Sequence, residues 1–268
     1  MRNSESEDLA EVAQGNWENF LPEGVASACP AWRRYCDSLH ENLIAEWCGG
    51  KKFRRALKTD VFDEAVGEGC FPTLAQVAGE VHGIDVSEPL VDLVSKRRPG
   101  FRLGVGDVRC LEFPDDSFDL VLSNSTLDHF ETEAEIERSV LELARVLEVR
   151  GRLLITLDNP VNPFVWIRNL LPQRATGAVG LVPYFIGKTL PMQKLVGLLE
   201  QSGFCILERR HTMHAPRVFF LHLLGTIQKS PAISNAILRS MLAMEVAAGL
   251  PSASLTGHYS AVLAERTN

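Results

Sequence analysis

Long apolar runs are absent from the sequence, since none reaches the roughly 18 residues that cross a bilayer. An export signal is not expected either, because the stretch MRNSESEDLAEVAQ at the N-terminus is polar and acidic. The six cysteines lack CxxC spacing, and no His and Cys cluster has the spacing of a zinc site. We therefore expect a reduced, cytoplasmic protein that binds no metal.

Basic residues are outnumbered by acidic ones. The chain of 268 residues has 27 Lys and Arg against 34 Asp and Glu, a formal net charge of −7. Nucleic-acid binding usually requires a basic stripe, so a nucleic-acid partner is not expected. The hydrophobic content of 46% is typical of a soluble globular protein with a sizeable core. The sequence leaves the oligomeric state open.

Residues 54–160 alternate between short apolar segments and amphipathic segments of about ten residues. This order is typical of βαβ units and a parallel sheet, in which strands such as DLVLS and RLLITL are buried on both faces. Before it, the stretch AWRRYCDSLHENLIAEWC has apolar residues four apart and is predicted to be helical. After Pro160, Pro- and Gly-rich stretches precede a helix at MQKLVGLLEQSGF and strands at CILERRHTMH and TGHYSAVLAE. We predict a helical segment over 1–53, an α/β core over 54–160, and a cap insert with completing strands over 161–268.

Polar residues and glycines follow the predicted strands of the core. Gly67 and Gly69 in DEAVGEG form a first turn where the backbone can approach a ligand. Asp85 ends the second strand, where it can accept two hydrogen bonds from a ribose diol. Asp107 ends the third strand, where its carboxylate can accept an adenine amino group while the N–H of Val108 reaches a ring nitrogen. Each of these residues alone is equally typical of an ordinary turn or helix cap.

Taken together, four blocks resemble the class I, Rossmann-like S-adenosylmethionine-dependent methyltransferases: DEAVGEG, VHGIDVS, GDVRCLEFPDDSFDLVLSNSTLDHF and ELARVLEVRGRLLIT. The resemblance covers residues 54–160 and, more weakly, the C-terminal strands. It implies a mostly parallel seven-stranded sheet with helices on both faces, and S-adenosyl-L-methionine as cofactor. It also implies a set of cofactor contacts: Gly67 and Gly69 along the methionine part, Asp85 at the ribose, Asp107 and Val108 at the adenine, and Asn124 under the methionine end.

The first turn departs from the family pattern Asp-x-Gly-x-Gly-x-Gly. Aligned on Asp63, the chain has Ala65 in place of the first glycine. In a second register RALKTD is the strand, Asp60 ends it, and VFDEAV is an additional loop. The strand also carries Lys58, where such strands are mostly apolar. The acid near the methionine is therefore Asp60, Asp63 or Glu64, and the sequence leaves the choice open.

Residues beyond the fourth and fifth strands are candidates for the methyl-acceptor side. Methyl transfer from a sulfonium mainly requires alignment and exclusion of water, and a base is useful only if the acceptor loses a proton. His129 in STLDHF is the candidate catalytic base, whereas Asp128 beside it is expected to cap a helix. Asp158 and Asn159 either face the acceptor or form an Asx turn.

The segments FVWIRNLL, GLVPYFIGKTL and RVFFLHLLGTI are more apolar than loops need to be. They predict a cap that covers the sheet and lines an apolar pocket. The leading hypothesis is a methyltransferase for a small apolar or aromatic metabolite, with O-, N- or C-methylation unresolved. One alternative is the same fold with non-methylating chemistry. Another is a non-catalytic binding module in peripheral contact with a membrane surface.

Overall fold

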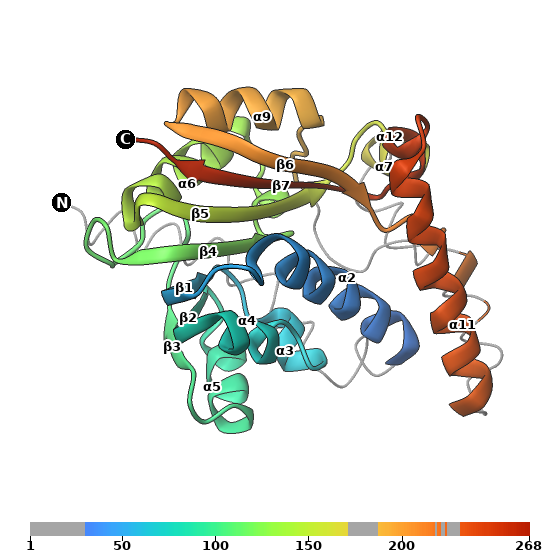
Figure 1. Ribbon diagram of the computed structural model, residues 1–268, viewed down its shortest axis with the longest axis horizontal. Coiled ribbons are helices and arrows are strands. Elements are labelled where there is room, and N and C mark those ends of the chain that lie inside the picture. Colours follow the sequence, from blue (N-terminus) through green and yellow to red (C-terminus); the bar gives the residue numbers. More distant parts are fainter. Residues whose placement is uncertain (1–29, 171–186, 218, 221–222, 224–230) are drawn as a thin grey trace.

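The structure is a computed structural model that describes residues 30–170, 187–217, 219–220, 223 and 231–268 (Figure 1). Within these residues seven strands form one sheet in the order β3-β2-β1-β4-β5-β7-β6. Strand β7 is antiparallel to β5 and β6, and the other neighbouring pairs are parallel. The strands are β1 (Phe53–Lys58), β2 (Ala78–Asp85), β3 (Arg102–Val105), β4 (Phe118–Asn124), β5 (Leu147–Asp158), β6 (Phe204–Thr212) and β7 (Tyr259–Arg266). The predicted Rossmann-like α/β fold is confirmed.

Helices alternate with the strands of the core and continue on its C-terminal side. The α-helices are α2 (Pro30–Cys48), α3 (Phe62–Val66), α4 (Phe71–Val77), α5 (Glu88–Arg97), α6 (Glu133–Val146), α7 (Pro163–Leu170), α9 (Met192–Gln201), α11 (Pro231–Ala243) and α12 (Ala253–Thr256). Two 3₁₀ helices, η3 (Leu127–His129) and η4 (Met244–Gly249), lie between them. In the part of the chain that the structure describes, no helix is both long and apolar enough to cross a membrane.

The sheet is covered on both faces because neighbouring residues of its strands point to opposite sides. In β4, Val121 packs into a core with α6 and α9, whereas Leu120 and Leu122 pack into a second core with α2, α4 and α5. Figure 1 shows α9 and α2 on the two sides of the sheet. Helix α6 begins at a capping box in which the Thr132 hydroxyl accepts from the Glu135 N–H and the Glu135 side chain accepts from the Thr132 N–H.

The first turn follows the second of the two registers. Strand β1 ends at Lys58, two residues before Asp60, and residues 62–66 form the short helix α3 instead of an extended loop. The Gly-x-Gly pair therefore lies between two helices, α3 and α4. The predictions for residues 1–29, for most of GLVPYFIGKTL and for most of RVFFLHLLGTI lie outside the described residues.

Gly69 gives a direct test of this turn. Its φ is +64°, and an added Cβ would lie 2.4 Å from the Glu64 Oε1 atom. We expect Gly69→Ala to lower the free energy of unfolding by about 2 kcal/mol or more, because left-handed backbone strain and overpacking add. Gly197→Ala in α9 is the control, since its Cβ would meet nothing within 4 Å and should stabilise the helix by about 1 kcal/mol. Urea unfolding of both variants measures the difference, and a Gly69→Ala protein as stable as wild type would contradict the described turn.

Candidate active site

The predicted site residues converge on one edge of the sheet. Strands β3, β2, β1 and β4 are adjacent and parallel, so their carboxyl ends bring Asp107, Asp85, Asp60 and Asn124 to the same edge. Asp85, Asp107 and Asn124 are buried, and Asp60 is partly exposed. The edge is therefore a buried polar surface at the position where open α/β sheets bind ligands.

Asp85 connects the second strand to the first turn. Its Oδ2 accepts the Val61 N–H at 3.0 Å, and its Oδ1 accepts the Ser87 N–H at 2.9 Å. Burial raises the pKa of Asp85 to about 6, against the effect of these backbone bonds. Each oxygen keeps a second lone pair for a hydroxyl. The predicted ribose contact is compatible with this geometry.

Asp107 is held by a neighbouring arginine. Arg109 donates through Nη2 to Asp107 Oδ2 at 2.7 Å and through its backbone N–H to Oδ1 at 2.8 Å. The same guanidinium pairs with Glu135 and lies over the Phe130 ring, 4.8 Å from its centroid. Val108 is buried beside this pair. Both oxygens of the Asp107 carboxylate are thus already engaged by Arg109, and its contact with the adenine stays a prediction.

Asn124 contacts the first turn through Asp63. Its Nδ2 donates to Asp63 Oδ2 at 2.7 Å, and Arg33 from α2 pairs with Asp63 Oδ1 at 2.9 Å. Although burial by itself would raise the pKa of Asp63, Arg33 and Lys58 hold it at about 2. Helix α2 is thus joined electrostatically to the turn, a contact that sequence reasoning missed because 30 residues separate Arg33 from Asp63.

Lys58 is fully buried at the end of β1. Its Nζ lies 3.0 Å from Glu64 Oε2 and 3.4 Å from Asp60 Oδ1. Burial alone would lower the pKa of Lys58, but the two carboxylates hold it well above its usual value. Burial also raises the pKa of Glu64 to about 7, although its Oε1 accepts the Cys70 N–H at 2.7 Å. Of the three acids that the sequence left open, Asp60 and Glu64 pair with Lys58, and Asp63 pairs with Arg33.

Side chains of the protein itself pack against the two glycines of the first turn. Gly67 has an extended φ of −150°. A Cβ there would lie 2.8 Å from Arg33 Cγ and 2.8 Å from Asp37 Oδ2. Glu64 packs in the same way against Gly69. The glycines are required by this packing, and their contact with a cofactor stays a prediction.

His129 and Asp128 lie in η3, directly after β4. Asp128 does not cap a helix: its Oδ2 accepts the Asp158 N–H at 3.1 Å and the Ser125 hydroxyl at 3.3 Å. Burial, together with the nearby Asp158 charge, raises the pKa of Asp128 to about 6. His129 Nε2 lies 3.8 Å from Asp128 Oδ1, and its side chain is 22% exposed. The histidine therefore lies at the correct edge, and its role as a base stays a prediction.

Asp158 is the centre of a second polar group at the end of β5. Its Oδ2 accepts from Arg168 Nη1 at 2.6 Å, and its Oδ1 lies 3.3 Å from His258 Nε2. The sequence did not indicate these partners, since His258 is 100 residues further along the chain. Asn159 is structural: its Oδ1 accepts the Val161 N–H in an Asx turn, and its Nδ2 donates to the carbonyl of residue 257.

Three buried polar atoms at this edge have no hydrogen-bond partner among the described residues: Ser87 Oγ, Asn124 Oδ1 and Asp128 Oδ1. Buried polar atoms are normally satisfied by protein, water or a ligand. Together with the free lone pairs of Asp85, they fit a ligand rich in hydroxyl and amino groups along β2 and β4. The contacts of Asp85 and Asp107 with an adenosyl group stay predictions.

Comparison with known proteins indicates a methyltransferase. Residues 62–155 match the family model described as "Methyltransferase domain". A protein of Mycolicibacterium smegmatis described as a "Probable S-adenosylmethionine-dependent methyltransferase" is 27% identical over 191 residues, which cover 67% of each chain. A human "eEF1A lysine and N-terminal methyltransferase" is 35% identical over 157 residues, which are 52% of this chain and 20% of that protein.

A solved structure of an S-adenosylmethionine-dependent methyltransferase from Archaeoglobus fulgidus is also similar. It superposes with a TM-score of 0.56 at 16% identity, covering 86% of this chain and 94% of that one. A likeness at this identity shows the fold. Residues 62–155 therefore carry a methyltransferase domain, and the chain has the Rossmann-like fold of such enzymes. The relatives and the fold support a class I S-adenosylmethionine-dependent methyltransferase whose cofactor is S-adenosylmethionine.

The ribose assignment can be tested at Asp85. Asp85→Asn keeps the side-chain shape but removes the charge and one acceptor, and each hydrogen bond to a charged group contributes about 1.5–3 kcal/mol. We expect calorimetric titration to show S-adenosylmethionine binding at least tenfold weaker. Asp92→Asn, on the exposed surface of α5, should bind as wild type does. A folded Asp85→Asn protein with unchanged affinity would refute the assignment.

The raised pKa of Asp128 predicts that the stability of the fold depends on pH. Its pKa is about 6 in the folded chain and 3.8 in the reference state. The folded chain therefore binds this proton more tightly than the unfolded chain does. The free energy of unfolding consequently falls as the pH rises from about 4 to 6. Asp128→Asn removes this dependence, so the variant should gain up to about 3 kcal/mol relative to wild type between pH 4 and pH 7. Denaturant unfolding at both pH values measures the gain, and a stability difference independent of pH would contradict the prediction.

Proposed function

We propose that the chain transfers a methyl group from S-adenosylmethionine to a small apolar or aromatic metabolite. The observation that carries the proposal is the surface of α7, the helix after β5. Four of its apolar side chains are half to two-thirds exposed: Phe164, Trp166, Ile167 and Leu170. Contiguous exposed apolar groups mark interaction sites more often than ordinary surface.

Helix α7 is held at the site by two other residues. Val165 is fully buried, and Arg168 pairs with Asp158 at the carboxyl end of β5. Among the described residues, nothing covers the aromatic side chains of Phe164 and Trp166, which are 62% and 56% exposed. Figure 1 shows α7 beside α12 at one end of the sheet. An apolar surface next to the cofactor edge favours an acceptor with an apolar or aromatic body.

The polar groups at this edge would act on the acceptor. Because the donor carbon is already activated, these groups mainly orient the acceptor and exclude water. His129 is the proposed base for an acceptor that must lose a proton. We also propose that residues 1–53 and 161–258 cover the acceptor above the core of residues 54–160, in a cytoplasmic enzyme. The net charge of −7 disfavours a nucleic-acid acceptor.

The proposal is tested with S-adenosylmethionine that carries a deuterated methyl group. We expect mass spectrometry to find the label in small molecules when the protein is incubated with a metabolite extract, and not in tRNA or protein fractions. Asp85→Asn should lose this transfer. Trp166→Ser should raise the acceptor KM several-fold and leave the affinity for S-adenosylmethionine unchanged, because it lies on α7. Label that enters only tRNA or protein would overturn the proposed acceptor class.

The exposed face of α7 also suits a membrane-surface module, the second candidate function. Vesicle flotation separates the two candidates. Binding to vesicles that Trp166→Ser abolishes, in a protein that labels no small molecule, would favour the module. Cofactor binding without label in any fraction would favour non-methylating chemistry on this fold.

A further inference from the structure

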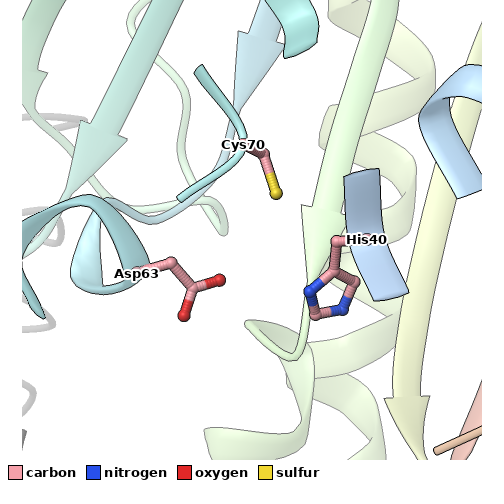
Figure 2. Close-up of side chains that lie close together, drawn as sticks. All are labelled: His40, Asp63 and Cys70. Atoms are coloured by element: carbon pink, nitrogen blue, oxygen red, sulfur yellow. The ribbon is translucent and has the colours of Figure 1, made fainter. Parts of the chain in front are cut away.

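Three buried side chains from separate elements meet behind the first turn (Figure 2). His40 comes from α2, Asp63 from α3, and Cys70 directly precedes α4. One ligand atom of each, a ring nitrogen, a carboxylate oxygen and the thiol sulfur, lies within 4.8 Å of the other two. His40 is 4% exposed, Asp63 7% and Cys70 0%. From this juxtaposition we propose that the chain binds one divalent transition-metal ion, of which Zn²⁺ is the best match, between α2 and the first turn.

The imidazole of His40 supplies independent support. Its Nδ1 atom is buried and has no hydrogen-bond partner within the described ranges. Figure 2 shows the ring edge that carries this nitrogen facing Asp63, with the Cys70 sulfur close to both. A buried polar atom without a partner is costly, and a metal ion satisfies an imidazole lone pair as a hydrogen-bond donor would.

The charges around the three residues also favour a cation. Two buried or largely buried cations and four carboxylates form two neighbouring sets of ion pairs with N–O distances of 2.9–3.4 Å. Arg33 pairs with Asp37 and Asp63, and Lys58 pairs with Asp60 and Glu64. The carboxylates exceed the cations by two charges. Uncompensated buried charge is strongly unfavourable, so protons or a divalent ion must supply the missing positive charge.

The chemical types of the three donor atoms indicate which metal ion the site would bind. Zn²⁺ accepts imidazole nitrogen, thiolate sulfur and carboxylate oxygen as ligands, whereas Ca²⁺ and Mg²⁺ prefer oxygen alone. Asp63 uses one oxygen for Arg33 and the other for Asn124, but a carboxylate has about four lone-pair sites and can accept a third partner. On binding, the Cys70 thiol loses its proton to solvent and its thiolate bonds the ion. Metal bonds of about 2.0–2.3 Å would draw the three side chains closer by up to about 1 Å.

Such a site would attach α2 to the turn that precedes the cofactor edge. The sequence predicted no metal because His40, Asp63 and Cys70 have no recognisable spacing; the helix packing alone brings them together. The inference does not depend on the acceptor proposed above, and its test uses the metal alone.

The test is metal binding by the whole chain. We expect one equivalent of zinc per chain by elemental analysis after dialysis against Zn²⁺, and a melting temperature that rises with Zn²⁺ and falls with EDTA. Cobalt bound in place of zinc should show a sulfur-to-cobalt absorption band. Cys70→Ser should abolish this band and weaken Co²⁺ binding at least tenfold, and His40→Gln should weaken binding to the same degree. Cys48→Ser and His82→Gln, which change residues outside the cluster, should behave as wild type.

The opposite results would overturn the site. One such result is a cobalt–sulfur band that persists in Cys70→Ser. The other is a wild-type protein that retains no zinc and whose melting temperature changes with neither Zn²⁺ nor EDTA. The wild-type measurements decide the question even if a variant fails to fold. Calorimetric titration of the EDTA-treated chain with S-adenosylmethionine shows separately whether cofactor binding survives.

Discussion

Lys58 is a fully buried cation at the end of β1, near the middle of the sheet. Removing an ammonium group from water costs several kcal/mol, so the fold must surround it with acceptors. Asp60 and Glu64 do so, and Glu64 in turn accepts the Cys70 N–H. Glu64 and its neighbour Asp63 both lie in α3. The path of the whole first turn therefore depends on the neutralisation of Lys58 by Asp60 and Glu64. The short helix thus stands where a glycine-rich loop was expected.

The same constraint explains why α2 belongs to the site. Asp63 is next to Glu64 but faces Arg33, and Arg33 also holds Asp37. Helix α2 therefore packs against the first turn, and the two glycines leave room for the side chains around them. A cofactor bound along this edge would meet a turn that ion pairs already hold in place. Such preorganisation reduces the ordering cost of binding.

The proposed acceptor side is organised around a different buried acid. Asp158 at the end of β5 binds Arg168, which anchors α7, and it lies beside His258 at the start of β7. Asp128 is connected to it through the backbone N–H of Asp158. One strand end thus positions both the apolar helix and the polar groups that would meet an acceptor. The arrangement joins the core to the C-terminal strands, so the two sides of the site are parts of one sheet.

The sequence by itself determined the α/β class, the strand and helix order, and the strand ends that carry Asp85, Asp107 and Asn124. These features rest on local periodicity and on spacing within βαβ units, which short stretches encode. Only the tertiary structure decided the partners of those residues: Arg109 on Asp107, Arg33 on Asp63, and His258 on Asp158. The His40, Asp63 and Cys70 cluster was equally invisible. Ion pairs and shared cavities depend on which helix faces pack together. The spacing of apolar residues predicts that a helix has a buried face, but it does not specify which polar side chains of other elements lie beside that face.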